Sequence, residues 1–281
     1  MGSNRPIDPL THPLVAGVLA EGRQAYVTVA ASGGPHVTPE LYAVDGGRLW
    51  FFAAAGTLKA RLLPRRPSVA VLVRAGGRAV AMVGEVAAFH PAALPPMADV
   101  LRAPAAVARY SLRNAVDLAG FASDLARGRL GWRVPQVRVL FSVRPTGVAL
   151  LDGFAVREQW GSWPGSCGSA ASTDVAQSSA AVGAVVALGW GDGSLLALPG
   201  RWHQDDSRAQ VPTDLLALAA APSPVDAAVV VDDYGAPGPA AKRGVMLRGS
   251  AVVEDDGWLT VDADRTVLWD GIETGTVKAT G

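Results

Sequence analysis

A hydroxyl and two basic side chains alternate along one short segment of the chain, Thr57-Leu58-Lys59-Ala60-Arg61. The segment follows a run of small residues, Ala53-Ala54-Ala55-Gly56, which would let a ligand approach the backbone closely. A helix that begins here would offer free backbone N–H groups beside a hydroxyl and cations, a combination that suits a phosphate. The same pattern also fits an ordinary capped surface helix with solvated cations. The residues alone therefore leave an anion site and a capped helix as alternatives.

Composition draws attention to Lys59 within this segment. The 281 residues include 25 basic side chains, and the only lysines are Lys59, Lys242 and Lys278. In so arginine-rich a chain a lysine is less often incidental, which favours a binding role for Lys59. The 25 basic residues are balanced by 25 acidic ones, so no global field would recruit nucleic acid or an anionic membrane. With 49% hydrophobic and 18% charged residues, the chain is not disordered.

Cysteine content and hydropathy bear on where the protein works. The single cysteine, Cys167, excludes an internal disulfide framework. No apolar run approaches the roughly 18 residues of a membrane-spanning helix, and the N-terminal residues lack the apolar core of a signal peptide. We therefore expect a cytoplasmic protein that binds a small molecule and has neither a membrane nor a nucleic acid as its partner.

Short apolar runs between Gly-containing turns predict antiparallel strands through the first half of the chain. Periodicity near 3.6 residues predicts the helices, of which two lie at 92–130 and are interrupted near Pro104. Such a pattern favours a β-barrel or sandwich over a doubly wound sheet. The predicted strands are 25–31, 35–44, 48–54, 68–74, 78–89 and 136–150, and the shorter predicted helices are 11–22 and 57–64.

The second half of the chain repeats this pattern in a weaker form. Residues 226–232 resemble 68–74, and the strand at 243–253 resembles the one at 80–89. We therefore predict an internal duplication, in which one chain reproduces a dimer. The other elements predicted here are strands at 182–189, 194–199, 257–262 and 265–279 and a helix at 212–221. Gly189–Ser194 is a hairpin turn rather than a dinucleotide-binding loop, because a strand-like run follows it.

Several short motifs occur in a fixed order in the first half: Val37-x-Pro39-x-x-Tyr42, Asp45-Gly46, Leu49-x-Phe51, Thr57-x-Lys59-x-Arg61-x-Leu63 and Pro67-x-Val69. This frame resembles the pyridoxamine 5′-phosphate oxidase-like, FMN-binding split β-barrel family, most closely over residues 11–90. The resemblance implies a mostly β fold with inserted helices, built as two tandem split β-barrels that form a pseudo-dimer in one chain. The implied domains are an FMN-binding barrel at 1–155 with a helical insert at 92–130, a linker at 156–180 and a second, degenerate barrel at 181–281.

The resemblance also implies a cofactor site in the first half. It assigns the flavin phosphate to Thr57 and Lys59 with help from Arg61, and it places two strands beside the cofactor through Val37, Thr38, Pro39, Phe52 and Ala53. Glu85 is a further candidate contact with the ring, and Trp160, Trp163, Trp202 and Trp269 are candidates for the site walls. The corresponding turn of the second half reads Thr213-Asp214, where an acid would repel a phosphate. We expect one cofactor site per chain, lined partly by the second half.

By this resemblance the protein is an FMN-binding oxidoreductase that exchanges a hydride with an unknown small molecule, with a deazaflavin coenzyme as the alternative cofactor. Because the cofactor ring carries the hydride, no catalytic acid or base is required, and none is assigned. No metal site is expected. The alternative is a non-catalytic flavin- or haem-binding or sensing protein, for which His203 is the candidate haem ligand. Further homodimerisation of the fused halves is left open.

Overall fold

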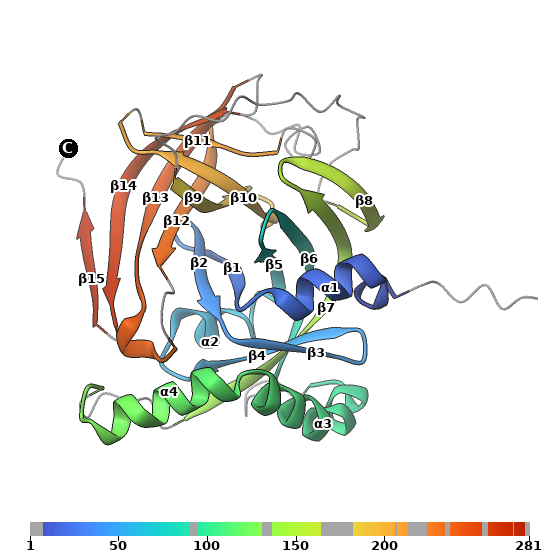
Figure 1. The fold of residues 1–281 in the computed structure, drawn as a ribbon. Helices are drawn as coiled ribbons and strands as arrows, with labels where there is room; N and C mark the ends of the chain where they lie inside the picture. Colours follow the sequence, from blue (N-terminus) through green and yellow to red (C-terminus); the bar gives the residue numbers. More distant parts are fainter. Residues whose placement is uncertain are drawn as a thin grey trace, which may run out of the picture.

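The computed structural model of the chain describes residues 8–89, 95–130, 137–163, 182–205, 207–212, 224–233, 237–254, 258–271 and 273–278. These residues form two antiparallel sheets with helices packed beside the first (Figure 1). We call residues 8–163 the first half and residues 182–278 the second half. Residues 213–221 of the helix predicted at 212–221, which include Thr213 and Asp214, lie outside the described residues, as does Cys167. No helix in the described part of the chain is long and apolar enough to cross a membrane.

The first sheet is a half-barrel whose two end strands come from one continuous stretch of chain. Its strand order is β2-β1-β5-β6-β7-β4-β3, with β8 paired to β7, so β2 and β3 lie at opposite ends although Leu41 alone separates them in sequence. The strand predicted at 35–44 is therefore two strands, one paired to β1 and one to β4, at opposite ends of the sheet. The strands are β1 (Ala25–Ala31), β2 (Gly34–Glu40), β3 (Tyr42–Asp45), β4 (Arg48–Ala54), β5 (Ser68–Ala75), β6 (Arg78–Phe89), β7 (Arg138–Asp152) and β8 (Ala155–Gly161).

The second sheet repeats the order of the first over five strands, and it closes into a six-stranded barrel because β11 pairs with both β10 and β14. Its order is β11-β10-β9-β12-β13-β14-β15, in which β10, β9, β12, β13 and β14 correspond to β2, β1, β5, β6 and β7. The predicted tandem split-barrel fold is confirmed. The strands are β9 (Val182–Gly189), β10 (Leu195–His203), β11 (Arg208–Gln210), β12 (Val225–Asp233), β13 (Arg243–Val253), β14 (Trp258–Asp270) and β15 (Glu273–Lys278).

The duplication extends to a bulge in the same pair of strands. The register shifts between Val83 and Gly84 where β6 pairs with β7, and between Arg248 and Gly249 where β13 pairs with β14. A Cβ atom on Gly84 would lie 2.3 Å from a backbone carbonyl oxygen, and one on Gly249 would lie 1.9 Å from another. Glycine is therefore required at both bulges, which bend the long strands around their barrels.

The two halves share a hydrophobic core and several buried polar contacts. Arg248, which is 4% exposed, donates to the carbonyl oxygens of Gly33 (2.9 Å), Gly34 (2.8 Å) and Pro35 (2.9 Å), where the turn after β1 leads into β2. The Tyr26 hydroxyl donates to Asp232 Oδ1 at 3.0 Å, from β1 to β12. Because these groups are removed from water and paired across the halves, they fix one arrangement of the two sheets.

The helices lie against the first barrel, and one predicted break was misplaced. They are α1 (Pro13–Glu21), α2 (Leu58–Leu62), α3 (Met97–Arg113) and α4 (Ala115–Ala126), with 3₁₀ turns η1 (Pro9–Thr11) and η3 (Pro239–Ala241). The break predicted near Pro104 is wrong, because Pro104 lies inside α3. Proline has no N–H to donate to the Val100 carbonyl, but both residues are exposed, so solvent can satisfy that carbonyl. The chain turns at Asn114, whose side chain donates to the carbonyls of Tyr42 (3.1 Å) and Tyr110 (2.9 Å).

Two other element predictions needed correction, and one strand was missed. The linker predicted at 156–180 begins too early, because residues up to Gly161 form β8 on the edge of the first sheet. The predicted strands 257–262 and 265–279 are divided differently, since β14 runs without interruption to Asp270 and the chain turns at Gly271. Strand β11 was not predicted, because its three residues are too few to show a period.

Candidate functional site

The turn after β4 leads into a capped helix. Of the two alternatives that the sequence left open, an anion site and a capped helix, the structure shows the cap. Thr57 is the N-cap of α2, and its hydroxyl donates to the Ala54 carbonyl at 2.7 Å and accepts from the Ala60 N–H at 3.4 Å. Arg61 lies in the last turn of α2 and is exposed. The Thr57 hydroxyl is thus already satisfied by its own backbone, which is the usual role of threonine at this position.

Lys59 is one of the most deeply buried charged side chains in the described part of the chain, at 2% exposure. Its ammonium donates to Thr38 Oγ1 and to Glu40 Oε1, and it forms an ion pair with that Glu40 carboxylate. Thr38 and Glu40 are two residues apart in β2 and therefore lie on the same face of the strand. The Lys59–Glu40 ion pair links α2 to β2. It also neutralises the Lys59 cation, which the family resemblance assigns to a phosphate.

A cavity of about 400 Å³ lies next to this ion pair, between the first barrel, the helical insert and the second half. We call it the inter-half cavity. Its volume is within the range of about 300–1,000 Å³ that is usual for small-molecule sites. Pro39, Glu40 and Phe52 line it from the barrel, Tyr110 and Phe121 from α3 and α4, Arg138 from β7 and Lys242 from the second half. Lys59 is not among its lining residues, so Glu40 stands between Lys59 and the cavity.

Aromatic side chains form one wall of the inter-half cavity. The rings of Phe52 and Tyr110 meet edge to face with their centroids 4.9 Å apart, and the Arg138 guanidinium lies 5.7 Å from the centre of the Phe121 ring. Flat apolar surfaces of this kind suit a planar ring ligand, and the guanidinium suits an anionic or carbonyl group on it.

The second half closes the cavity through a close backbone approach to α4. The Ala240 N–H in η3 donates to Asp124 Oδ2 at 3.2 Å. A Cβ atom on Gly120 would lie 2.8 Å from the backbone at Pro237 and Gly238, so glycine is needed where α4 meets this segment. Residues of both halves line this cavity, which is the composition predicted for the cofactor site, and that a cofactor binds there stays a prediction.

The charged groups around the cavity influence one another. Burial raises the pKa of the Tyr110 hydroxyl to about 12, and the negative charge of Glu40 adds to this shift. Burial lowers the pKa of Lys242, while the carboxylates of Asp117 and Glu40 oppose that shift. Burial also lowers the pKa of His36 to about 4, with the positive charge of Lys59 as the second cause. Tyr110 is therefore a neutral donor at neutral pH, and the charge of Glu40 reaches the cavity wall.

The residues at this corner do not fit a phosphate held by Lys59. An anion approaching from the cavity would meet the Glu40 carboxylate before the ammonium, and like charges repel. The aromatic wall, by contrast, fits the ring of a flavin-type cofactor. The phosphate contact assigned to Thr57, Lys59 and Arg61 stays a prediction to which this arrangement gives no support.

The remaining predicted residues are distributed over several places. Pro39 and Phe52 line the inter-half cavity, whereas Val37 is buried in the core between the sheets and Ala53 in the core of the first barrel. Glu85 is mostly exposed and pairs with Arg144 at 2.7 Å, away from the cavity. The four tryptophans serve other contacts: Trp163 and Trp202 are buried between the sheets, Trp160 packs on His12, and Trp269 lines a different cavity.

His203, the candidate haem ligand, packs edge-on against Trp258 with ring centroids 4.8 Å apart. Clusters of three or more His, Cys, Asp or Glu side chains that could hold a metal are absent from the described residues.

Sequence reasoning missed Glu40, Tyr110, Phe121, Arg138 and Lys242 as parts of the site. The alternation along β2 places Glu40 on the same face as Thr38, and this signal was available. The scarcity of lysine also marked Lys242. The residues of α3 and α4 gave no local signal, because their approach to the barrel depends on the tertiary fold.

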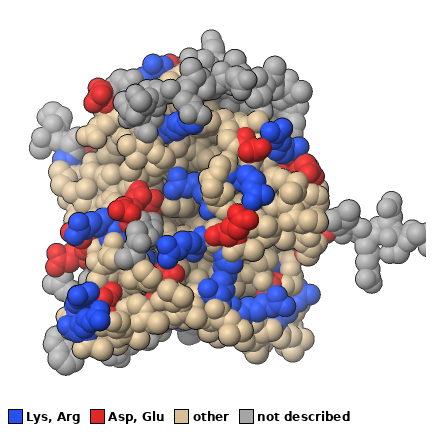
Figure 2. All heavy atoms as spheres, in the orientation of Figure 1, with Lys and Arg blue, Asp and Glu red and all other residues tan. Residues whose placement is uncertain are grey.

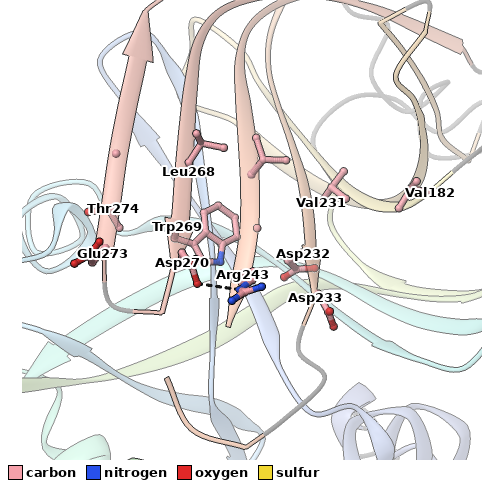
Figure 3. A pocket seen from close by; sticks show the side chains of 13 residues that line it. Val182, Val231, Asp232, Asp233, Arg243, Leu268, Trp269, Asp270, Glu273 and Thr274 are labelled. Carbon is pink, nitrogen blue, oxygen red and sulfur yellow. Dashed lines mark hydrogen bonds and ion pairs between the residues drawn. The ribbon is translucent and has the colours of Figure 1, made fainter. Parts of the chain in front are cut away.

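A second cavity of about 780 Å³ lies within the curve of the second sheet (Figure 3). Val231 and Leu268 form part of its apolar wall, and the Arg243–Asp270 ion pair (2.9 Å) lies at its edge. In the first half, α1 covers the corresponding end of β5 and β6, and its Val18 is part of the barrel core. This second cavity shares no lining residue with the inter-half cavity.

Charges of both signs are interspersed over the face of the molecule drawn in Figure 2, as the balanced composition predicts.

Comparison with known proteins places the first half in a family context. Residues 16–117 match the family model described as pyridoxamine 5′-phosphate oxidase. These residues include the motif segment and, from the cavity wall, Pro39, Glu40, Phe52 and Tyr110. The comparison with curated proteins gave no match.

Solved structures are similar over about half of the chain. A protein of unknown function from Agrobacterium tumefaciens is 23% identical over 48% of this chain and 53% of its own, with a TM-score of 0.33. The match thus spans about half of that protein. A pyridoxamine 5′-phosphate oxidase-related, FMN-binding protein from Nostoc punctiforme is 15% identical over 54% of this chain and 88% of its own (TM-score 0.37). A FAD-binding protein from Mesorhizobium loti is 19% identical over 48% of this chain and 89% of its own, with a TM-score of 0.32. The resemblance to the pyridoxamine 5′-phosphate oxidase-like family that the sequence predicted is confirmed, over residues 16–117 of the chain.

Proposed function

We propose that this chain binds a flavin-type cofactor with its ring in the inter-half cavity, and that it is an oxidoreductase acting on a small molecule. The observation that carries the proposal is that the segment matching the family model, residues 16–117, supplies much of the cavity wall. Phe52 and Tyr110 would pack on the ring, and the neutral Tyr110 hydroxyl and Arg138 would donate hydrogen bonds to it. Closure by η3 and α4 would exclude water from the ring.

When bound, such a ring supplies the hydride chemistry, and the protein contributes orientation and electrostatics. FMN and a deazaflavin coenzyme are the two candidate cofactors. They share the ring shape that the aromatic wall suits and differ in their spectra and in their reactivity towards oxygen.

Two measurements test the proposal. Absorption and mass spectra of the small molecule that co-purifies with the protein identify a flavin or deazaflavin directly. Titration of the ligand-free protein with riboflavin, FMN, FAD and a deazaflavin, followed by flavin fluorescence, then gives the affinities. The proposal predicts saturable binding of at least one of them and its reversible reduction on the protein. Absence of binding by all four would refute it.

A non-catalytic flavin- or haem-binding or sensing protein is the second candidate. The Glu40–Lys59 ion pair favours it, because a neutralised cation weakens the hold on a phosphorylated cofactor and so favours exchange of the ligand. A bound flavin that no substrate or reductant converts, or a haem Soret band, would select this alternative.

A further inference from the structure

Glu40 and Lys59 form the feature of the inter-half cavity that departs most from a site for a phosphorylated cofactor. The Lys59 side chain is 2% exposed and the Glu40 side chain is 20% exposed. Glu40 lines the cavity and Lys59 does not. A ligand in the cavity therefore meets the Glu40 carboxylate. The Lys59 ammonium behind it already donates hydrogen bonds to Thr38 Oγ1 and Glu40 Oε1.

We propose that Glu40 is a specificity-determining residue, whose carboxylate takes the place of a ligand phosphate at Lys59 and so selects flavin-type ligands that carry no phosphate at this corner. This proposal rests on the proposed function in one respect, which is that the ligand has a flavin-type ring. It predicts the opposite of the sequence-based expectation, in which Lys59 itself holds the cofactor phosphate.

The geometry gives Glu40 the position that such selection requires. Because Thr38 and Glu40 share one face of β2, both reach the same ammonium, and the cation is satisfied without any ligand. A phosphate could bind Lys59 only after displacing the Glu40 carboxylate, which has the same charge sign as itself, and the displaced carboxylate would remain at the cavity wall. A neutral ring substituent meets no such repulsion and can donate a hydrogen bond to Glu40.

Riboflavin and FMN provide the test, because they share one ring system and differ by a single phosphate. Flavin fluorescence titrations give the ratio of the riboflavin to the FMN dissociation constant, which measures selectivity for the phosphate. The proposal predicts a ratio below one for the wild-type protein, because the Glu40 carboxylate lines the cavity and repels the FMN phosphate. For Glu40→Gln it predicts a ratio raised at least tenfold, because a charge-assisted hydrogen bond to a freed Lys59 is worth about a tenfold change or more.

Further variants keep the test decisive. Glu40→Gln combined with Lys59→Met should bring the ratio to near one, and Glu85→Gln, which removes an exposed carboxylate outside the cavity, should leave the wild-type ratio unchanged. Glu40→Asp, whose carboxylate is drawn back from Lys59 by one methylene, should give an intermediate ratio and replaces Glu40→Gln if that variant fails to fold. A wild-type ratio of one or more, which would mean no selection against the phosphate, or an unchanged ratio in Glu40→Gln, would overturn the proposal.

Inorganic phosphate separates this proposal from the proposed function. Millimolar phosphate should raise the melting temperature of Glu40→Gln by several degrees and leave that of the wild type unchanged at equal ionic strength. If no variant binds any flavin, the proposed function fails, and the phosphate-dependent shift alone decides the role of Glu40. Equal shifts in both proteins, or none in either, would refute that role.

Discussion

Replacing Glu40 by Gln should leave a buried cation without its counter-ion. The Lys59 ammonium keeps hydrogen bonds to Thr38 and to the new amide, but it loses the negative charge that offsets its transfer from water. Breaking a buried ion pair costs about 3–5 kcal/mol, and the 20% exposure of the Glu40 side chain favours the lower end of that range. We therefore expect Glu40→Gln to reduce the free energy of unfolding by about 3 kcal/mol.

Lys59→Met should cost less, about 1–2 kcal/mol, because the remaining Glu40 carboxylate lines a cavity and can take a ligand or water as its partner. The double variant should lose about 1–2 kcal/mol, since it carries neither charge. The double-mutant cycle then gives a coupling energy of about 3 kcal/mol.

Urea unfolding followed by circular dichroism measures these values, with the exposed Glu85–Arg144 pair as the matched control. The side chains of that pair are 58% and 61% exposed, so its coupling energy should stay below about 0.5 kcal/mol. Additive effects of Glu40→Gln and Lys59→Met within about 0.5 kcal/mol would refute the inferred ion pair.

Three other predictions concern the scaffold, all measured as free energies of unfolding. Burial raises the pKa of Asp232 from 3.8 to about 6, so stability should fall by about 2 kcal/mol as the pH rises from 4 to 6, and Asp232→Asn should remove this loss. The pKa of His36, lowered from 6.5 to about 4 by burial, acts in the opposite sense: stability should fall as the pH drops from 6.5 to 4, and His36→Gln should remove that loss. Gly249→Ala should cost more than about 2 kcal/mol through its clash with a backbone carbonyl, whereas Gly17→Ala, in an open helical position, should stabilise by about 0.5–1 kcal/mol. Arg248→Ala should cost about 3 kcal/mol or more because it leaves buried carbonyls without donors, and a loss below 1 kcal/mol would contradict its role between the halves.

Much of the fold could be predicted because the strands carry their own boundaries in the sequence. The bounds predicted for β1, β4, β9 and β13 agree with the structure, since apolar runs end at Gly, Asp or Pro residues that favour turns. The prediction of a helix break near Pro104 was wrong because the position of the break is not set by local sequence. A local rule against proline in helices was overridden at an exposed position, and the true break at Asn114 depends on contacts with Tyr42 in the barrel.

The location of the candidate site could be predicted from the sequence, but the contacts among its side chains could not. The motif around Lys59 located the correct corner of the barrel, and Pro39 and Phe52 do line the neighbouring cavity. The partner of Lys59 could not be derived from the spacing, because whether Glu40 faces α2 or solvent depends on how the helix docks on β2. Tyr110 and Lys242 reach the cavity from a helical insert and from the other half, and no local pattern links them to Lys59.

The most direct test of the whole account asks whether the ligand lies in the inter-half cavity. Ser111 is an exposed residue of α3 that lines this cavity, and Ala115 is an exposed residue at the start of α4 that does not. Ser111→Trp should fill the cavity and weaken riboflavin binding at least tenfold in a fluorescence titration, whereas Ala115→Trp should bind riboflavin like the wild type. Unchanged binding by Ser111→Trp, with both variants folded, would contradict the account.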